Sequence, residues 1–229
     1  IHKIEDRSKE VAVLHLRLPI GRRVPFLAGQ YVTVMMEGGD SRNYSIANPP
    51  HLNDSVELHV RRVPGGRFSD HILSRLKPGD SLDLELPFGL FTWRDDPSRP
   101  VIMLATGTGF APLKSMIRDL IHRKVSRPVH LFWGSEREAD IYDRALVESW
   151  TKALPWFRFT PVLASPDADW KGATGFVQNA VLAEYGDLSG HEVYACGNPI
   201  MIEHANRMLT EQGALSADAF YSDAFVFSG

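Results

Sequence analysis

The sequence predicts two domains: an antiparallel Greek-key β-barrel over residues 1–98, followed by a doubly wound parallel α/β sheet over residues 99–229. Up to about Pro97, short alternating strand patterns are separated by glycine and proline turns, which is typical of a small barrel. The segment Asp95–Pro100 has the composition of a linker. After it, apolar strands alternate with helical patterns, and this alternation predicts a parallel sheet with helices on both faces.

The barrel strands are indicated by period-two alternation of apolar and polar residues. The predicted strands begin near Ile1 and continue at residues 11–18, 31–36, 56–62 and 81–86. Turn signals follow each of them, such as Gly38-Gly39 and Pro64-Gly65-Gly66. One helix interrupts the strands, and we predict it over Ser69–Leu76 with Ser69 as its N-cap.

The second domain follows from four strand–helix pairs. Strands are predicted at residues 101–105, 129–133, 157–163 and 192–195. Helices are predicted at residues 112–123, 139–152, 176–184 and 199–211. The four aromatic residues between Phe220 and Phe227 favour core or edge-strand packing.

Composition excludes several classes of function. A net charge of -3 gives no electrostatic argument for a nucleic acid or membrane partner, and no apolar run is long enough to span a bilayer. The single cysteine, Cys196, excludes an internal disulfide or four-cysteine cluster and fits a reducing cytoplasm. The nine histidines show no metal-ligand spacing, so we expect no metal. Because the chain starts at Ile1, we expect a fragment or processed product.

The stretch Arg42–Asn48 is the first candidate binding site. Arg42 and Tyr44 alternate, so in a strand they share one face, on which Asn48 is a further candidate. Ser45 offers a hydroxyl or a backbone group. A cation, a ring and a hydrogen-bonding group suit an anionic planar ligand. Taken alone, the stretch fits an exposed strand rim better.

Three glycine-containing stretches are further candidates. Residues 63–69 open a helix with Gly66 and Arg67, which suits either an anion site or a plain hairpin loop. Residues 106–112, T-G-T-G-F-A-P, join a strand to a helix and favour nucleotide binding, although the third glycine and the acid of the standard fingerprint are absent. Residues 195–199 repeat this geometry, with Cys196 equally consistent with a buried apolar role and a functional one.

Taken in this order, the motifs R-x-Y-S-x-x-N, G-R-F-S, G-T-G-x-A-P and C-G-x-P resemble those of the ferredoxin–NADP reductase superfamily. The resemblance covers essentially the whole chain. It is greatest to reductase components of oxygenases, deoxysugar-dehydrase reductases and bacterial flavin reductases. It implies a barrel that binds FAD and an α/β domain that binds NADH or NADPH, and so a flavoprotein oxidoreductase.

The resemblance also implies roles for individual residues. Arg42 would pair with flavin phosphate, Tyr44 would pack on the isoalloxazine ring, and Ser45 would lie near the hydride-accepting nitrogen. The other flavin contacts would be His59, Val60 and Arg61 along the ring and ribityl chain, and Gly66, Arg67, Phe68 and Ser69 at the pyrophosphate. The nicotinamide dinucleotide would contact Thr106, Gly107, Thr108, Gly109 and Pro112, with Cys196 and Gly197 beside its nicotinamide ring.

The catalytic residues implied by the resemblance are Ser45, Cys196, Asp223 and Phe225. Phe225 would cover the other flavin face. The closing acid-x-aromatic pattern has Asp223 where many relatives have Glu, and the chain continues to Gly229. The acids Glu136 and Glu138, either side of Arg137, disfavour a 2′-phosphate, so we expect a preference for NADH.

The expected function is an NADH-dependent FAD reductase that passes electrons singly to an iron–sulfur partner. The partner would be a 2Fe-2S ferredoxin-type protein, or a domain missing upstream, and would serve an oxygenase or similar system. One alternative is a free-standing flavin reductase that releases reduced flavin. Another is a regulatory module that binds flavin or nucleotide without turnover.

Overall fold

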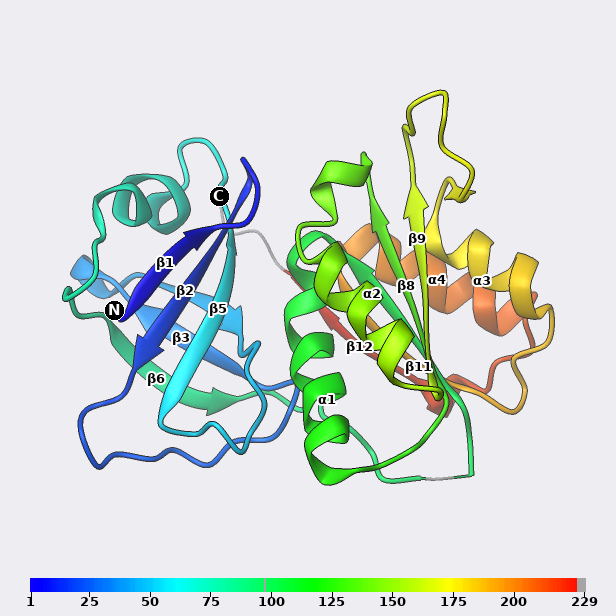
Figure 1. The fold of residues 1–229 in the computed structure, drawn as a ribbon, viewed down its shortest axis with the longest axis horizontal. Coiled ribbons are helices and arrows are strands. Elements are labelled where there is room, and N and C mark those ends of the chain that lie inside the picture. The colour runs from blue at the N-terminus through cyan, green and yellow to red at the C-terminus, as the bar shows by residue number, and fades with distance from the viewer. Residues whose placement is uncertain (97, 226–229) are drawn as a thin grey trace. The chain divides into compact units, whose positions relative to one another are not determined.

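The computed structural model describes residues 1–96 and 98–225. The chain forms two compact units (Figure 1). Of the described residues, the first unit contains 1–94 together with 111–125, and the second contains 95–96, 98–110 and 126–225. The helix after the T-G-T-G-F-A-P stretch therefore groups by its contacts with the β-rich unit.

The first unit contains two three-stranded antiparallel sheets around one apolar core. One has the order β1-β2-β5, formed by Lys3–Asp6, Val11–Arg17 and Ser55–Arg61. The other has the order β4-β3-β6, formed by Ser41–Ser45, Tyr31–Met35 and Asp83–Phe88. An isolated antiparallel bridge between Ile46 and Leu58 connects them. The predicted antiparallel architecture of this half is confirmed.

The predicted helix Ser69–Leu76 begins at the wrong residue. The helical segment runs over Arg67–Ile72, with Gly66 as its N-cap, and a 3-10 turn covers Leu73–Arg75. The Ser69 hydroxyl does not cap a helix; it accepts the backbone N–H of Val63 at 3.3 Å. Because the Ser69 hydroxyl bonds to the preceding loop, it is not available as an N-cap, and the helical segment begins two residues earlier.

The second unit contains a six-stranded parallel sheet with the order β10-β9-β8-β7-β11-β12. Its strands are β7 (Val101–Thr106), β8 (Val129–Ser135), β9 (Phe157–Leu163), β10 (Ala173–Thr174), β11 (Glu192–Gly197) and β12 (Phe220–Ala224). The predicted parallel α/β sheet is confirmed. The sequence patterns did not separate β10, which is two residues long. Of the C-terminal aromatics, Phe220 and Tyr221 lie on the edge strand β12, in agreement with the edge-strand alternative, and Phe227 lies outside the described residues.

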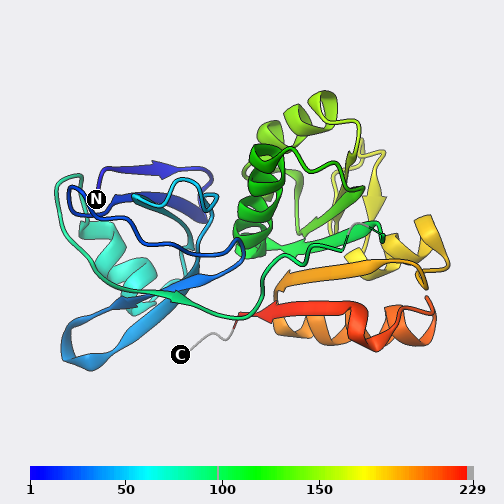
Figure 2. The same cartoon turned by 90° about the horizontal axis from the view of Figure 1, so that it is seen from below.

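Helices cover both faces of this sheet. Residues of α3 (Val177–Tyr185) and α4 (Pro199–Glu211) share one apolar core with alternate strand residues such as Ile102 and Phe132. On the other face lies α2 (Arg144–Ala153), seen opposite α4 in Figure 2. The helix predicted from Ala139 begins at Arg144 instead, because residues 138–140 form a separate 3-10 turn.

The strand order fixes where loops can meet. Successive strands β7, β8 and β9 proceed toward one edge, whereas β11 and β12 lie on the other side of β7. The order therefore reverses between β7 and β11, and at such a switch point the loops after the two strands separate and leave room for a ligand. The loop after β7 is the T-G-T-G stretch, and β11 ends at Gly197.

The helix α1 (Phe110–Arg123) is attached to the first unit by polar contacts from buried residues. The Lys114 ammonium lies 2.8 Å from a carboxylate oxygen of Glu57 on β5. The Ser115 hydroxyl donates to the backbone carbonyl of Asn48 at 2.8 Å. Within the described part of the chain, no helix has the length and apolar character needed to cross a bilayer.

Candidate functional site

Two arginines that are distant in the sequence converge on one carboxylate in the first unit. Arg42 on β4 donates to Asp40 at 2.6 Å, and Arg67 at the start of the helical segment donates to the other oxygen of Asp40 at 3.1 Å. Arg67 also donates to the backbone carbonyl of Glu37. The Arg42 hydrogen bond, followed by that from the Ser41 N–H, lowers the pKa of Asp40. The cluster places two guanidinium groups where an anionic ligand could reach both.

Two aromatic residues lie next to this cluster in the sequence and contact each other. The rings of Tyr44 and Phe68 have centroids 5.3 Å apart and are tilted by 47°. Phe68 is fully buried in the barrel core, so only its backbone is free to contact a ligand. Tyr44 is partly buried at the edge of this core, and its burial raises the pKa of the phenol. Of the two rings, Tyr44 is the candidate for stacking.

Ser45 and His59 lie opposite each other. Because Ile46 pairs with Leu58 in an antiparallel bridge, the preceding Ser45 faces the following His59. Ser45 is 6% exposed and His59 is 3% exposed. The ring of His59 contacts Glu57 at 2.9 Å and lies 3.4 Å from the Lys114 nitrogen. Its imidazole thus takes part in a buried charge cluster, and its flavin contact stays a prediction.

The buried charge cluster consists of Glu57, His59 and Lys114. The Glu57 carboxylate accepts hydrogen bonds from both partners, and its second oxygen lies 3.9 Å from Arg118 and 3.8 Å from His15. Burial alone would raise the pKa of Glu57. The hydrogen bond from His59 and the charge of Lys114 lower this pKa by more than burial raises it. The net result is a pKa well below the usual range, so Glu57 is ionised inside the protein.

The other predicted barrel residues have varied environments. Val60 is fully buried in the core, and Arg61 is half exposed with its guanidinium 3.1 Å from Glu10. A Cβ on Gly66 would lie 2.4 Å from the Ser69 hydroxyl oxygen, so that space is filled by the protein itself. The contacts of these residues with a cofactor stay predictions.

Asn48 has a structural role. It was expected on the face of Arg42 and Tyr44, but it is only 3% exposed. Its amide nitrogen donates to the carbonyls of Leu52 and Ser55, and its amide oxygen accepts the N–H of Glu57 at 2.7 Å. These hydrogen bonds hold the loop before β5 in a fixed conformation.

In the second unit, the loops after β7 and β11 touch through their backbones. A Cβ on Gly109 would lie 2.1 Å from the carbonyl oxygen of Cys196, and one on Gly197 would lie 2.4 Å from the hydroxyl of Thr106. That hydroxyl also accepts the N–H of Asn198 at 3.0 Å. Glycine is required because any side chain would push the loops apart. The structure thus brings together Thr106, Gly109, Cys196 and Gly197, as predicted from strand-end positions.

Gly107 differs from these glycines. It has a φ of +52°, and a Cβ there would have no atom within 4 Å. The outer side of the T-G-T-G turn is therefore open, so a ligand can approach its backbone. Thr108 is partly exposed in the same turn, whereas Pro112 is buried in the first turn of α1.

The end of β12 lies beside Cys196. Asp223 is the register partner of Cys196, and the N–H of Phe225 donates to the carbonyl of Gly197 at 2.9 Å. Burial raises the pKa of Asp223. Burial, followed by the charge of Asp223, raises the pKa of the Cys196 thiol well above its ordinary value. The predicted catalytic set of this unit, Cys196, Asp223 and Phe225, is adjacent along two neighbouring strand ends.

The buried thiol leads to a direct prediction. Cys196 is fully buried and its pKa is raised, so little reactive thiolate is accessible in the folded protein. We expect iodoacetamide to leave the native chain unlabelled over hours at pH 8 and to add one label after unfolding in guanidinium chloride. Intact-mass spectrometry measures both states. Labelling of the native protein at the rate of the unfolded chain would contradict this assignment.

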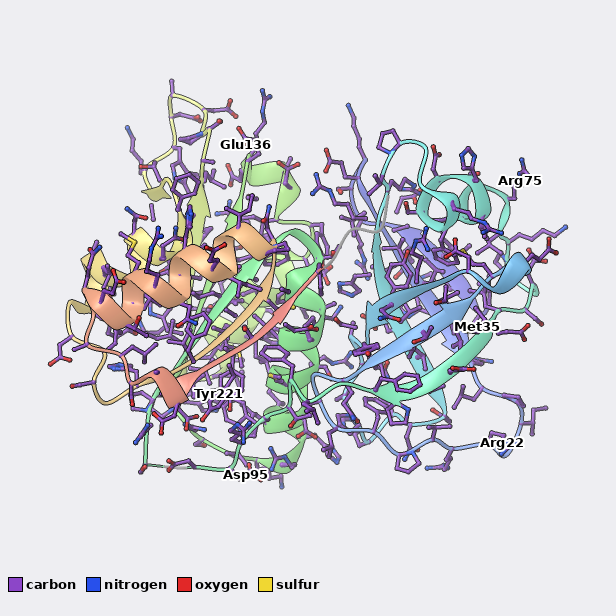
Figure 3. All side chains as sticks on the ribbon, turned by 180° about the vertical axis from the view of Figure 1, so that it is seen from behind. Arg22, Met35, Arg75, Asp95, Glu136 and Tyr221 are labelled. Atoms are coloured by element: carbon purple, nitrogen blue, oxygen red, sulfur yellow. The ribbon has the colours of Figure 1, made fainter. Side chains whose placement is uncertain are left out.

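The loop after β8 carries the acids considered for coenzyme choice. Glu136 lies in this loop (labelled in Figure 3) and accepts a hydrogen bond from the Ser165 hydroxyl. Glu138 pairs with Arg144 of α2. Among the described residues, no group of three or more histidine, cysteine or acidic side chains could hold a metal ion.

Comparisons with known proteins decide the family. A model of the oxidoreductase FAD-binding domain matches residues 1–93, and one of the oxidoreductase NAD-binding domain matches residues 103–207. A CDP-6-deoxy-L-threo-D-glycero-4-hexulose-3-dehydrase reductase of Yersinia pestis is 42% identical over 226 residues, 99% of this chain and 68% of the relative. The chain belongs to the ferredoxin–NADP reductase-like family. It is an NAD(P)H-dependent flavoprotein oxidoreductase domain.

Other relatives of this reductase point the same way. Terephthalate 1,2-dioxygenase reductase component 2 of Comamonas sp is 42% identical over 220 residues, which cover 96% of this chain and 65% of the relative. The Amycolatopsis cytochrome P450 reductase GcoB superposes with a TM-score of 0.91 at 31% identity, covering 98% of this chain and 68% of that one. The ferredoxin reductase in carbazole 1,9a-dioxygenase gives a TM-score of 0.85 at 27% identity, covering 98% and 68%.

The residues of the reductase fit the cofactors that its domains bind. The guanidinium groups of Arg42 and Arg67 converge on one carboxylate, and this donor set suits a diphosphate. The open backbone of Gly107 at the sheet's switch point suits a dinucleotide.

Sequence reasoning missed Asp40, Glu57 and Lys114. Asp40 stands two residues before Arg42, a spacing that places both on one strand face, but Arg67 is 27 residues away. No sequence pattern indicated that Glu57 and Lys114 form a buried pair. A lysine within an apolar helix pattern is usually exposed, so Lys114 was not a candidate.

Proposed function

We propose that this reductase is an NADH-dependent, FAD-containing enzyme that passes electrons singly to an iron–sulfur partner. The observation that carries the proposal is the 42% identity, across 96% of this chain, to a reductase component of a terephthalate dioxygenase. The phenol 2-monooxygenase reductase component DmpP of a Pseudomonas species and the phenol hydroxylase P5 protein of Acinetobacter pittii support it, each at 38% identity. The partner would belong to an oxygenase or similar system.

The chain spans about two thirds of the curated relatives it matches, 65% and 66% of the first two. The electron-accepting centre is therefore proposed to lie on a partner or on another part of a longer protein. A 2Fe-2S cluster of the ferredoxin type is the proposed acceptor, and it would lie outside these 229 residues because their single cysteine cannot supply its ligands.

FAD, when bound, supplies the conversion of a two-electron hydride into single electrons. Arg42 and Arg67 are proposed to hold its phosphates, and Tyr44 to pack on its ring. Ser45 is proposed to donate a hydrogen bond at the reacting edge of the ring. Its low exposure limits competition from water.

In the second unit, Gly107 and Thr108 are proposed to contact the nicotinamide dinucleotide, with Cys196 and Gly197 beside the nicotinamide ring. Phe225 is proposed to cover the other face of the flavin ring. Asp223 is proposed as the acid of the C-terminal acid-x-aromatic pattern. The Cys196 thiol acts as a neutral packing group in this scheme, since burial raises its pKa.

NADH is the proposed coenzyme. Glu136 is held in place by Ser165, and Glu138 stands two residues further along the same loop. Arg144 offsets the charge of Glu138, so the Glu136 carboxylate is the group that would mainly repel the 2′-phosphate of NADPH. We expect kcat/KM for NADH to exceed that for NADPH at least about tenfold, which corresponds to roughly 1.4 kcal/mol.

The test combines flavin retention, reduction and electron transfer. The protein should purify yellow with FAD, and anaerobic NADH should bleach its absorption. Ser45→Ala should retain FAD but bleach about a hundredfold more slowly, as expected when a donor at the reacting centre is lost. A 2Fe-2S ferredoxin, with cytochrome c as reporter, should then accept electrons.

The alternatives predict other outcomes of the same test. A protein that purifies colourless and turns over added riboflavin or FMN would be a flavin reductase. A flavin that no concentration of NADH bleaches would indicate a binding module without turnover. Either result, or higher kcat/KM with NADPH, would overturn the corresponding part of the proposal.

A further inference from the structure

The Asp40 carboxylate lies between the guanidinium groups of Arg42 and Arg67 and contacts both. One oxygen of its carboxylate accepts from Arg42 at 2.6 Å and from the Ser41 N–H at 2.8 Å, and the other accepts from Arg67 at 3.1 Å. Its backbone carbonyl accepts the N–H of Met36 at 2.8 Å, which closes the β3–β4 hairpin. Met35, labelled in Figure 3, is the last residue of β3, after which the turn of this hairpin begins. The turn thus fixes the carboxylate between the two guanidinium groups.

The carboxylate uses the donors that a phosphate would use. A carboxylate and a phosphate oxygen both accept from guanidinium groups with similar geometry. Both N–H groups of the Arg42 Nη1 are directed to protein oxygens, one to Asp40 and one to the Ser41 carbonyl at 2.7 Å. Arg67 divides its two terminal nitrogens between Asp40 and the Glu37 carbonyl. A phosphate that engages these nitrogens must displace Asp40 or share them with it.

The charge balance points in the same direction. The cluster carries two arginine charges and one aspartate charge, so its net charge is +1. A diphosphate carries about two negative charges and would be matched by the arginines alone. The Asp40 side chain is 32% exposed, and those of Arg42 and Arg67 are 21% and 46% exposed. At this exposure solvent screens each ion pair, so the pairs can exchange partners.

We propose that Asp40 is an internal competitor for the phosphate site: it bridges Arg42 and Arg67, and the flavin phosphates must displace it or share these donors with it. Asp40 lowers the affinity for phosphate-bearing flavins and prevents the arginines from repelling each other when the site is free. It is a specificity-determining residue that acts through Arg42 and Arg67. This inference rests on the proposed phosphate contacts of these arginines.

The test measures flavin binding to the apoprotein of the complete chain by fluorescence quenching. Asp40→Asn keeps the size of the side chain and an oxygen for the Ser41 N–H, but removes the competing charge. We expect the Kd for FAD and for FMN to fall about three- to tenfold, the range given by losing two exposed ion pairs. The Kd for riboflavin, which carries no phosphate, should stay unchanged. The gain for FAD should shrink in high salt.

A matched control separates competition from general charge. Asp83 on β6 pairs with Met35, which on its other side pairs with Ser41. Asp83→Asn therefore removes the same charge about two strand spacings, roughly 10 Å, away in the same sheet. It should tighten FAD binding less than twofold. Equal tightening by both variants would overturn the proposal, as would equal tightening for riboflavin.

Two further variants distinguish this inference from the proposed site itself. If Arg42→Ala and Arg67→Ala leave FAD binding unchanged, the phosphates bind elsewhere and the proposed site fails. If they weaken FAD binding while Asp40→Asn leaves it unchanged or weaker, the competitor role alone is wrong. Asp40→Ser serves as a second variant if Asp40→Asn misfolds, and circular dichroism checks the fold of each.

Discussion

Replacing Lys114 by Met is expected to destabilise the protein by about 3–5 kcal/mol, the usual effect of removing one member of a buried ion pair. Lys114 is 4% exposed and Glu57 is 8% exposed, so water cannot replace the lost ammonium. The carboxylate would stay buried with His59 as its nearest remaining partner. Urea denaturation followed by far-UV circular dichroism measures the change in the free energy of unfolding.

Two controls accompany this variant. The double variant Glu57→Gln/Lys114→Met removes both charges and should recover at least half of the lost stability, because no unpaired ion remains. Arg123→Met, on the same helix, breaks the exposed Arg123–Asp119 pair of 2.8 Å and should lower stability by less than about 1 kcal/mol. A Lys114→Met effect as small as that of Arg123→Met would show that the buried pair contributes little.

The same carboxylate predicts the acid limb of stability. The folded-state pKa of Glu57 lies well below its ordinary value of 4.5. A depressed carboxylate pKa contributes stability that is fully present above the ordinary value and is lost as the pH falls below it. Glu57→Gln should therefore flatten the decline of stability below about pH 4.5, relative to the parent.

Replacing Gly109 by Ala is expected to have the second large effect. The new Cβ would lie 2.1 Å from the Cys196 carbonyl oxygen and 2.8 Å from the Gly197 Cα, both backbone atoms that cannot swing aside. The loops after β7 and β11 must separate, and overpacking of this kind costs about 1–3 kcal/mol. Since these loops are proposed to hold the nicotinamide dinucleotide, KM for NADH should rise tenfold or more while FAD stays bound.

Gly107→Ala is the matched control in the same turn. No atom lies within 4 Å of its Cβ position, but its φ of +52° is left-handed. We expect about 1–2 kcal/mol of local strain and no displacement of Cys196. Because Gly107 is itself a proposed dinucleotide contact, its KM cannot serve as the control. Urea denaturation and native-state iodoacetamide labelling of Cys196 in both variants distinguish steric displacement from strain. Equal loss of stability and equal Cys196 labelling in the two variants would show that contact with Cys196 is unimportant.

The fold could be predicted to a large extent because its signals are local. Strands such as Phe157–Leu163 and helices such as Pro199–Glu211 were predicted with their observed bounds, from periodicity and from the proline after Asn198. Errors arose where short polar residues choose between local partners. Ser69 bonds back to Val63, and Asp140 accepts the backbone N–H of Arg137 in a separate 3-10 turn, so neither helix begins where its pattern starts.

The candidate site was predictable where strand ends bring residues together and not where long-range ion pairs do. Thr106 and Gly197 could be placed together because parallel strand ends share an edge of the sheet. Nothing in the sequence pairs Glu57 with Lys114 or Asp40 with Arg67, since such pairs depend on the folded arrangement of distant segments. His59 lies two residues from Glu57 on the same strand, but its other neighbour in the cluster, Lys114, again comes from a distant segment.

The attachment of α1 to the first unit affects how the protein can be dissected. A fragment cut at the linker, residues 1–98, would lose the ammonium that neutralises Glu57 and the hydroxyl that satisfies the Asn48 carbonyl. Such a fragment would leave the Glu57 carboxylate on β5 without its lysine partner, so it should express poorly or self-associate. A flavin module that includes residues 111–125, rejoined through a short glycine-rich tether, is the smallest piece expected to behave as an independent protein.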